Sequence, residues 1–332
     1  MSGKTRRGGR GGEELMVPRA RPDSYYGRPV LKETPWEARD IAGYLFLGGL
    51  AGASSLLAAF AQLSGNRELP RVSKVAAVGA IGVSLAALVH DLGRPARFLN
   101  MLRVFKVTSP MSVGTWLVTA YGPMAGAAAA SAVTGRLPRA GAAATAGAAA
   151  LGAGVATYTA ALICDTAVPA WHEGYREMPF LFAGSAASAA GGLGMLAVAP
   201  DRAGPAVRFA AGGAVAELTA KRLMLRRMGA IAEPYHDGTA GRLLRAAEAL
   251  TVAGAVGAVL ARRSRPGLAL AGAALLAGSA LTRFGVFEAG RMSARDPKYT
   301  VGPQRQRLAE RAGQGELGGQ GGQGELGGGK TA

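Results

Sequence analysis

The sequence predicts an all-α integral membrane protein, with eight transmembrane helices in two four-helix bundles and disordered N- and C-terminal tails. Apolar runs recur along the 332-residue chain. Many are long enough to cross a bilayer, which takes about 20 residues. The chain is 49% hydrophobic but only 6% aromatic, and it has 51 glycines. Small residues, such as Gly48 and Gly52 in "LGGLAG", suit helices that associate in lipid by close backbone approach.

Loops rich in proline, glycine and arginine separate the predicted spans, for example "SGNRELPR" and "RRSRPG". The sixth span is the least regular because it contains Arg208, Glu217 and Lys221. We expect Glu217 and Lys221 to neutralise each other as an i,i+4 ion pair, with a proton path as the alternative. The eight spans are expected near residues 41–63, 75–92, 111–133, 140–165, 179–199, 204–224, 243–262 and 267–288.

The composition divides the chain into three segments. Residues 1–33 form a basic, largely disordered N-terminal segment, and its arginines are not followed by the apolar region of a signal peptide. Residues 34–305 form the membrane domain. Residues 306–332 form a glycine-rich tail that lacks the apolar side chains needed to fold.

The net charge of +17 does not indicate a nucleic-acid-binding protein. The arginines lie between apolar runs and in the tails, which is typical of loop anchors and orientation signals. Most of the lysines and arginines lie on the side of the long loops, and the positive-inside rule would place that side in the cytoplasm. Cys164 is the only cysteine, so the chain cannot form an intrachain disulfide or hold an iron–sulfur cluster.

The most informative stretch is "LAALVHDLGRPARFLNMLRVFKVTSPMS", residues 85–112. The second span ends here at His90 and Asp91, and Gly93 and Pro95 then force a tight exit from the helix. Three arginines follow with a spacing that can surround the carboxylate or bind a partner: Arg94, Arg97 and Arg103. The alternative is that His90 and Asp91 simply meet water at a helix end.

A second acid–base group is expected at the same membrane depth. Tyr158 and Asp165 are seven residues apart and share a face of the fourth span, and His172 and Glu173 follow after a loop. Oxidation of a quinol releases protons and electrons together, so it requires a base such as Asp or His. It also requires an electron acceptor, which this chain lacks. Haem is not expected, because the three histidines lie at helix ends or in loops.

Three motifs carry a resemblance to a known family: "HDLGRPARFLNMLRVFKVTSPMSVGTW", "DTAVPAWHEGYREMPF" and "SARDPKYTVGPQR". Residues 34–305 resemble the NrfD/polysulfide reductase membrane-subunit family. The resemblance implies a multi-pass subunit of the cytoplasmic membrane without haem or an iron–sulfur cluster. It further implies electron transfer between menaquinol or menaquinone and a four-cluster iron–sulfur subunit, which serves a molybdopterin catalytic subunit.

The motifs and the resemblance together assign roles to single residues. His90, Asp91 and Asp165 are expected to handle protons. Five residues are expected near the quinone: Tyr158, Arg94, Tyr44, His172 and Glu173. Arg97, Arg103 and Lys106 are expected to dock the iron–sulfur partner.

Two other functions stay open at this point, a passive membrane anchor without quinone chemistry and an ion or solute transporter. The orientation also stays open. Relatives with exported partners place the quinone pocket and both tails on the outer side, opposite to what the arginine distribution predicts.

Overall fold

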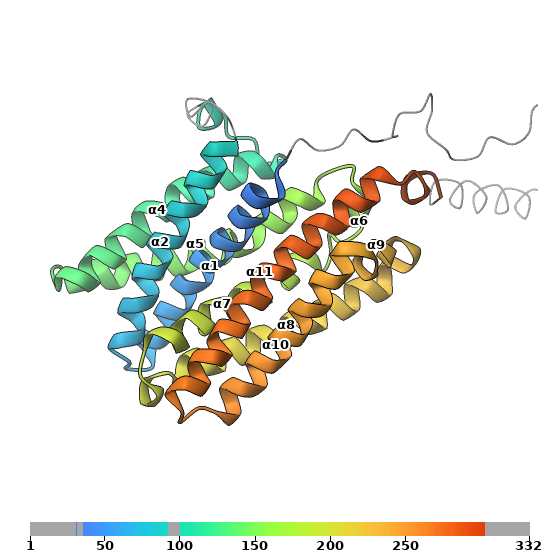
Figure 1. The fold of residues 1–332 in the computed structure, drawn as a ribbon. Helices are drawn as coiled ribbons and strands as arrows, with labels where there is room; N and C mark the ends of the chain where they lie inside the picture. Colours follow the sequence, from blue (N-terminus) through green and yellow to red (C-terminus); the bar gives the residue numbers. More distant parts are fainter. Residues whose placement is uncertain (1–30, 32–35, 92–99, 303–332) are drawn as a thin grey trace, which may run out of the picture.

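The computed structural model describes residues 31, 36–91 and 100–302, and this part of the chain is helical (Figure 1). It contains eight helices of 20 residues or more, one for each predicted span. Their bounds are α1 (Ala38–Leu63), α2 (Glu68–Asp91), α4 (Pro110–Thr134), α5 (Pro138–Cys164), α7 (Met178–Ala197), α8 (Gly204–Met228), α10 (Gly238–Leu260) and α11 (Arg265–Arg295). Apart from Leu31, the predicted N-terminal segment lies outside the described residues, as does the whole glycine-rich tail.

Six of these helices are long and apolar enough to cross a membrane: α1, α2, α5, α7, α10 and α11. The expectation of eight such helices is therefore supported only in part. α8 contains buried Glu217 and several arginines and lysines, and α4 contains glycine, serine, threonine and an internal Pro123. These residues lower the hydropathy of α4 and α8 without shortening them.

α1 is the central helix. It packs against α2 and α5 on one side and against α7 and α11 on the other, which joins the two halves of the chain (Figure 1). In its most apolar window 72% of the residues are buried, against 28% in α2 and in α10, so α2 and α10 lie at the periphery. α2 and α4 lie along one side of the molecule, and α8 and α10 lie along the other (Figure 1).

Local sequence explains where several helices begin and end. α4 begins after Ser109, whose side chain accepts a hydrogen bond from the backbone of Ser112, and it ends at Gly135 with φ 71°. α11 begins after Ser264, which caps Gly267 in the same way. Serine at the N-cap satisfies a free backbone donor, and glycine adopts the left-handed conformation without strain.

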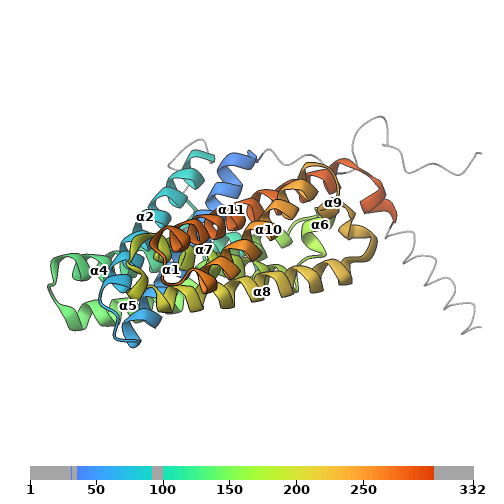
Figure 2. The ribbon, with the colours of Figure 1, turned by 60° about the horizontal axis from the view of Figure 1, so that its bottom comes forward.

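The long loops contain short helices instead of irregular chain. α6 (Pro169–His172) and α9 (Glu233–His236) lie at the same end of the molecule, where η3 (Gly229–Ala232) leads into α9 (Figures 1 and 2). The Tyr235 hydroxyl donates to the carbonyl of Ala170 at 2.8 Å and so joins α9 to α6. At the other end, η2 (Pro200–Arg202) connects α7 to α8.

Glycine allows helix backbones to touch at the centre. A Cβ atom on Gly52 of α1 would overlap the carbonyl oxygen of Gly152 on α5. Of the two glycines in the small-residue spacing predicted for α1, Gly52 therefore allows the close approach of α5. A Cβ on Gly48 would lie 3.4 Å from the Ser84 hydroxyl of α2, which is an ordinary contact distance.

We expect Gly52→Val to lower the stability of the protein by about 1–3 kcal/mol, because α1 and α5 must separate to admit the side chain. A thermal unfolding curve of the detergent-solubilised protein measures the change. Gly43→Val is the matched control on the same helix, since a Cβ there meets nothing within 4 Å. Equal unfolding midpoints for the two variants would contradict this packing.

Candidate functional site

An enclosed pocket lies among α1, α2, α4 and α5, close to the end of α2. Its volume is about 120 Å³. Most of its lining is apolar and comes from helices far apart in the sequence. The lining residues are Trp36, Ile41, Tyr44, Leu45, Leu85, Leu88, Asp91, Met101, Met111, Gly114, Thr115, Val118, Tyr158, Leu162 and Ile163. Three of the residues predicted to form the site, Tyr44, Asp91 and Tyr158, therefore meet around one pocket.

These three residues supply polar groups to an apolar pocket. Within the described part of the chain, neither the hydroxyls of Tyr44 and Tyr158 nor the carboxylate of Asp91 has a hydrogen-bond partner. Thr115 also lines the pocket, but its hydroxyl already donates to the Met111 carbonyl at 2.8 Å. Polar groups that converge on an apolar pocket without partners are typical of a site for a ligand with oxygen atoms.

Packing positions both tyrosines. Tyr44 is 4% exposed, and its backbone carbonyl accepts a hydrogen bond from the Ser84 hydroxyl of α2 at 3.1 Å. The Tyr158 ring lies directly over Gly114 of α4, where a Cβ atom would overlap it. The absence of a side chain at Gly114 thus allows the ring to reach the pocket.

A stack of aromatic rings continues from the pocket toward α11. Trp36, which lines the pocket, stacks on the fully buried Trp171 with ring centroids 6.2 Å apart. Trp171 also contacts Phe287 at 5.5 Å and donates from its indole nitrogen to the Val286 carbonyl at 2.8 Å. A Cβ on Gly290 would overlap the Trp171 indole. The wall of the pocket is therefore held by the C-terminal half of the chain.

His90 does not line the pocket. Its side chain is 78% exposed, and its Nδ1 lies 2.9 Å from the Asp40 carboxylate of α1. Asp91, Asp40, Glu37 and His90 are nevertheless close enough to interact electrostatically. The structure thus places Asp91 at the pocket and His90 on the adjacent surface.

The other predicted acid–base residues lie outside the lining of the pocket. Asp165 is exposed at the C-cap of α5, and His172 lies on the surface with its Nδ1 3.2 Å from the Cys164 carbonyl. Glu173 follows α6, and its backbone carbonyl accepts a hydrogen bond from Arg227 of α8. The loop after α5 is thereby held against the second half of the chain.

Arg227 also forms a bidentate ion pair with Glu177 just before α7, with both N···O distances at 2.7 Å. Hydrogen bonding to Arg227 lowers the pKa of Glu177. Because the folded pKa lies below the unfolded one, the ion pair stabilises the fold above the usual pKa of glutamate. That stabilisation is lost as the pH falls through the lowered pKa.

We expect Glu177→Gln to destabilise the protein by about 1–2 kcal/mol near neutral pH, because a charge-assisted bidentate contact is lost. The difference from wild type should shrink as the pH falls below the usual pKa of glutamate and through the lowered pKa of Glu177, because the wild-type carboxylate then becomes protonated. Unfolding midpoints measured across this pH range check the prediction. Asp201→Asn is the control, because that carboxylate is 74% exposed and 3.7 Å from Arg202, so little change is expected.

The predicted docking residues lie partly outside the described residues. Arg94 and Arg97 fall in the range 92–99, which the structure does not describe. Arg103 and Lys106 are both exposed. Between them Phe105 is 62% exposed and contacts Trp116 edge-to-face, with ring centroids 6.2 Å apart.

One predicted contact is wrong. Glu217 does not pair with Lys221: it is 3% exposed and accepts a hydrogen bond from the Thr282 hydroxyl of α11 at 2.7 Å. Lys221 binds Glu248 of α10 at 2.8 Å instead. The spacing allowed an i,i+4 pair, but α10 and α11 bring competing partners to the two faces of α8.

Sequence reasoning also missed two features that depend on packing, the Trp36–Trp171 stack and the buried Arg283 of α11. Arg283 is 1% exposed, and its position within an apolar run of the sequence was the signal that could have identified it as a buried charge.

Among the described residues, no group of three or more His, Cys, Asp and Glu side chains could hold a metal ion.

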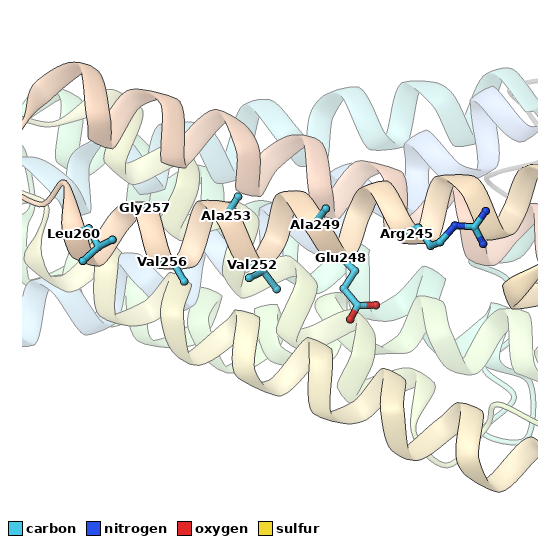
Figure 3. A pocket seen from close by; sticks show the side chains of 8 residues that line it. All are labelled: Arg245, Glu248, Ala249, Val252, Ala253, Val256, Gly257 and Leu260. Atoms are coloured by element: carbon cyan, nitrogen blue, oxygen red, sulfur yellow. The ribbon is translucent and has the colours of Figure 1, made fainter.

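A second hollow lies on the outer face of α10 and is open along its length (Figure 3). Small and apolar residues line it, from Ala249 to Leu260, with Glu248 and Arg245 at one end. Arg245 is engaged with the His236 carbonyl at 2.8 Å. This groove has the character of a lipid-facing surface and lacks the converging polar groups of the enclosed pocket.

Comparison with known proteins places the chain in a family. A family model described as "Polysulphide reductase, NrfD" matches residues 31–231, more than half of the chain. The match includes α1 to α8 and therefore all the residues that line the enclosed pocket; it ends before α9. A search of curated proteins found no match. With six apolar helices and this match, the chain is a multi-pass membrane protein that belongs to the polysulphide reductase NrfD family.

Proposed function

We propose that this protein is the quinone-reactive membrane subunit of a multi-subunit oxidoreductase, and that the enclosed pocket among α1, α2, α4 and α5 binds the quinone head group. Proteins of the NrfD family are membrane subunits of redox complexes and interact with quinones. The observation that carries the proposal is the meeting of Tyr44, Asp91 and Tyr158, all without partners in the described part of the chain, around one apolar pocket.

The pocket suits a flat ring. Methionine, leucine, isoleucine and tryptophan side chains form its walls, and its volume of about 120 Å³ is smaller than that of pockets which enclose a whole drug-sized ligand. The ring of menaquinol would enter, while the isoprenoid tail would extend past the rim into lipid. The Tyr44 and Tyr158 hydroxyls would donate to, or accept from, the quinone oxygens.

Asp91 is the base in this proposal. A carboxylate within reach of a quinol hydroxyl can accept the proton that leaves as the ring is oxidised. Asp40 and His90 interact with Asp91 and lie toward the surface, so they would pass the proton on to water. Asp165, His172 and Glu173 lie outside the pocket lining, and we propose for them a supporting role near its rim.

The electrons must leave to another subunit, because the chain has one cysteine and therefore no cluster of its own. We propose a four-cluster iron–sulfur subunit as the acceptor, which in turn serves a molybdopterin catalytic subunit. The exposed Arg103 and Lys106, with Arg94 and Arg97, would form the docking surface. In the complete proposal all eight long helices cross the cytoplasmic membrane, as two four-helix bundles joined at α1.

Photoaffinity labelling tests the site directly. An azido-naphthoquinone bound to the purified complex should label peptides that contain Met101, Met111 or Tyr158, and excess menaquinone should prevent the labelling. A passive anchor would show no labelling that menaquinone displaces. Displaceable labelling confined to α8, α10 and α11 would contradict the assignment of the pocket.

A further inference from the structure

A buried group of polar residues lies between α7, α8 and α11, outside the enclosed pocket. Glu217 is 3% exposed and Arg283 is 1% exposed, so both charged side chains lie in the interior. Glu217 lies 11 residues before the end of α8, which is about 16 Å along the helix axis at the usual helical rise. Charged groups that are buried among the helices of a membrane protein are costly and mark functional sites by default.

The hydrogen bonds of the group are incomplete. One Glu217 oxygen accepts from Thr282, but Oε2 has no partner. Arg283 donates from Nη2 to the Phe182 carbonyl at 2.8 Å and lies over the Phe182 ring, yet its Nε and Nη1 have no partner. The Ser185 hydroxyl donates to Ser279 at 2.9 Å and also interacts with the Glu217 carboxylate, but it is not within hydrogen-bond distance of Oε2. Three charged-group atoms therefore lack partners in one place.

Glu217 and Arg283 interact electrostatically, but they are not within ion-pair distance of each other. An unpaired acceptor and unpaired donors in the same interior are best explained by bound water, which can bridge groups that are too far apart to touch. α1 contributes Gly49, where a Cβ would lie 3.3 Å from the guanidinium, and so leaves space for it.

A series of charged residues leads from this group to the surface. Lys221 lies one turn beyond Glu217 on α8 with its side chain 14% exposed, and it binds Glu248, which is 38% exposed. Glu248 in turn lies 3.8 Å from Arg222, which is 67% exposed. Figure 3 shows the Glu248 side chain extending from α10 toward α8 at the end of the open groove. Exposure thus rises stepwise from the interior outward.

We propose that Glu217 and Arg283 bind internal water between them, and that Glu217 exchanges a proton with solvent through Lys221 and Glu248. The step is a proton transfer alone: the carboxylate gains or loses one proton, and water at the surface beside the partly exposed Glu248 supplies or accepts it. Within the described residues, α7 presents only Ser185 to the carboxylate, and α11 presents Thr282 and Arg283. This site is separate from the quinone pocket, so its failure would leave the proposed function intact.

Infrared difference spectroscopy of the full-length chain in lipid nanodiscs, recorded between two pH values, tests the exchange. We expect a carboxyl C=O band that shifts in D₂O, is lost in Glu217→Gln and is kept in Glu288→Gln. Glu288 is the matched control, a partly buried glutamate of α11 that lies 3.5 Å from Arg291. A spectrum of Glu217→Gln identical to that of wild type would overturn the proposal.

Two further variants separate exchange from folding. Thr282→Val keeps the carboxyl group but removes its hydrogen-bond donor, so the band should shift instead of disappearing. Glu248→Gln should leave the band in place and slow its exchange with D₂O about 100-fold, as expected when a positioned proton-transfer group is removed. Unchanged exchange would rule out this route, and a density map showing direct Glu217–Arg283 contact without water would rule out the hydrated site.

Discussion

Asp91→Asn should reduce quinol oxidation by the assembled complex about 100- to 10,000-fold, the usual effect of removing a positioned general base. Asparagine keeps the shape of the side chain but cannot take a proton. Among the described residues that line the enclosed pocket, Asp91 is the one with a carboxylate, so no other acid of that lining can replace it. Steady-state turnover with a menaquinol analogue measures the loss.

The comparison with Asp165→Asn makes this experiment specific. Asp165 is exposed at the C-cap of α5 and outside the pocket lining, so we expect a smaller effect than at Asp91. Quinone content should stay near wild type in Asp91→Asn, because the pocket volume is preserved. Undiminished turnover in both variants would show that neither carboxylate handles protons and would favour the passive anchor.

Gly114→Leu should weaken quinone binding about 10- to 100-fold, which corresponds to about 1.4–2.8 kcal/mol. A Cβ at Gly114 overlaps the Tyr158 ring, so the ring must move and the added side chain must occupy the small pocket. Both changes remove space and a hydrogen-bonding group from the same site. Menaquinone content of the purified complex and the affinity of a naphthoquinone inhibitor measure the effect.

Gly122→Leu is the matched control on α4, because a Cβ at Gly122 meets nothing within 4 Å. It should bind quinone as the wild type does. Thermal unfolding of both variants distinguishes a blocked pocket from a misfolded protein. If Gly114→Leu folds normally and retains its quinone, the head group binds elsewhere.

Sequence patterns predicted the helices well because a bilayer crossing imposes a length and a composition that are visible locally. All eight predicted runs are long helices in the described residues. The patterns predicted less well which helices are apolar enough to cross a membrane and where each helix ends. Two of the helices, α4 and α8, are not apolar enough to be identified as spans by composition, and α11 continues to Arg295, beyond the predicted end at 288.

The candidate site was only partly predictable. Asp91 and Tyr158 lie in motifs that pointed to proton chemistry, and the structure brings them together with Tyr44 around one pocket. Residues that are adjacent in the sequence nevertheless separate in space. His90 directly precedes Asp91, yet its side chain lies on the surface and binds Asp40. Which face of a helix end meets a pocket depends on the helices packed against it.

By itself, the sequence determined the class of the protein, the positions of the helices, the lack of a cluster-binding cysteine set and the motifs of the family. These features depend on local composition and on spacing along the chain. Only the tertiary structure decided that Glu217 binds Thr282 and not Lys221, that Arg283 is buried, and that Gly114 admits the Tyr158 ring. Each of these depends on which residues of distant helices meet, because packing selects among partners that spacing alone allows.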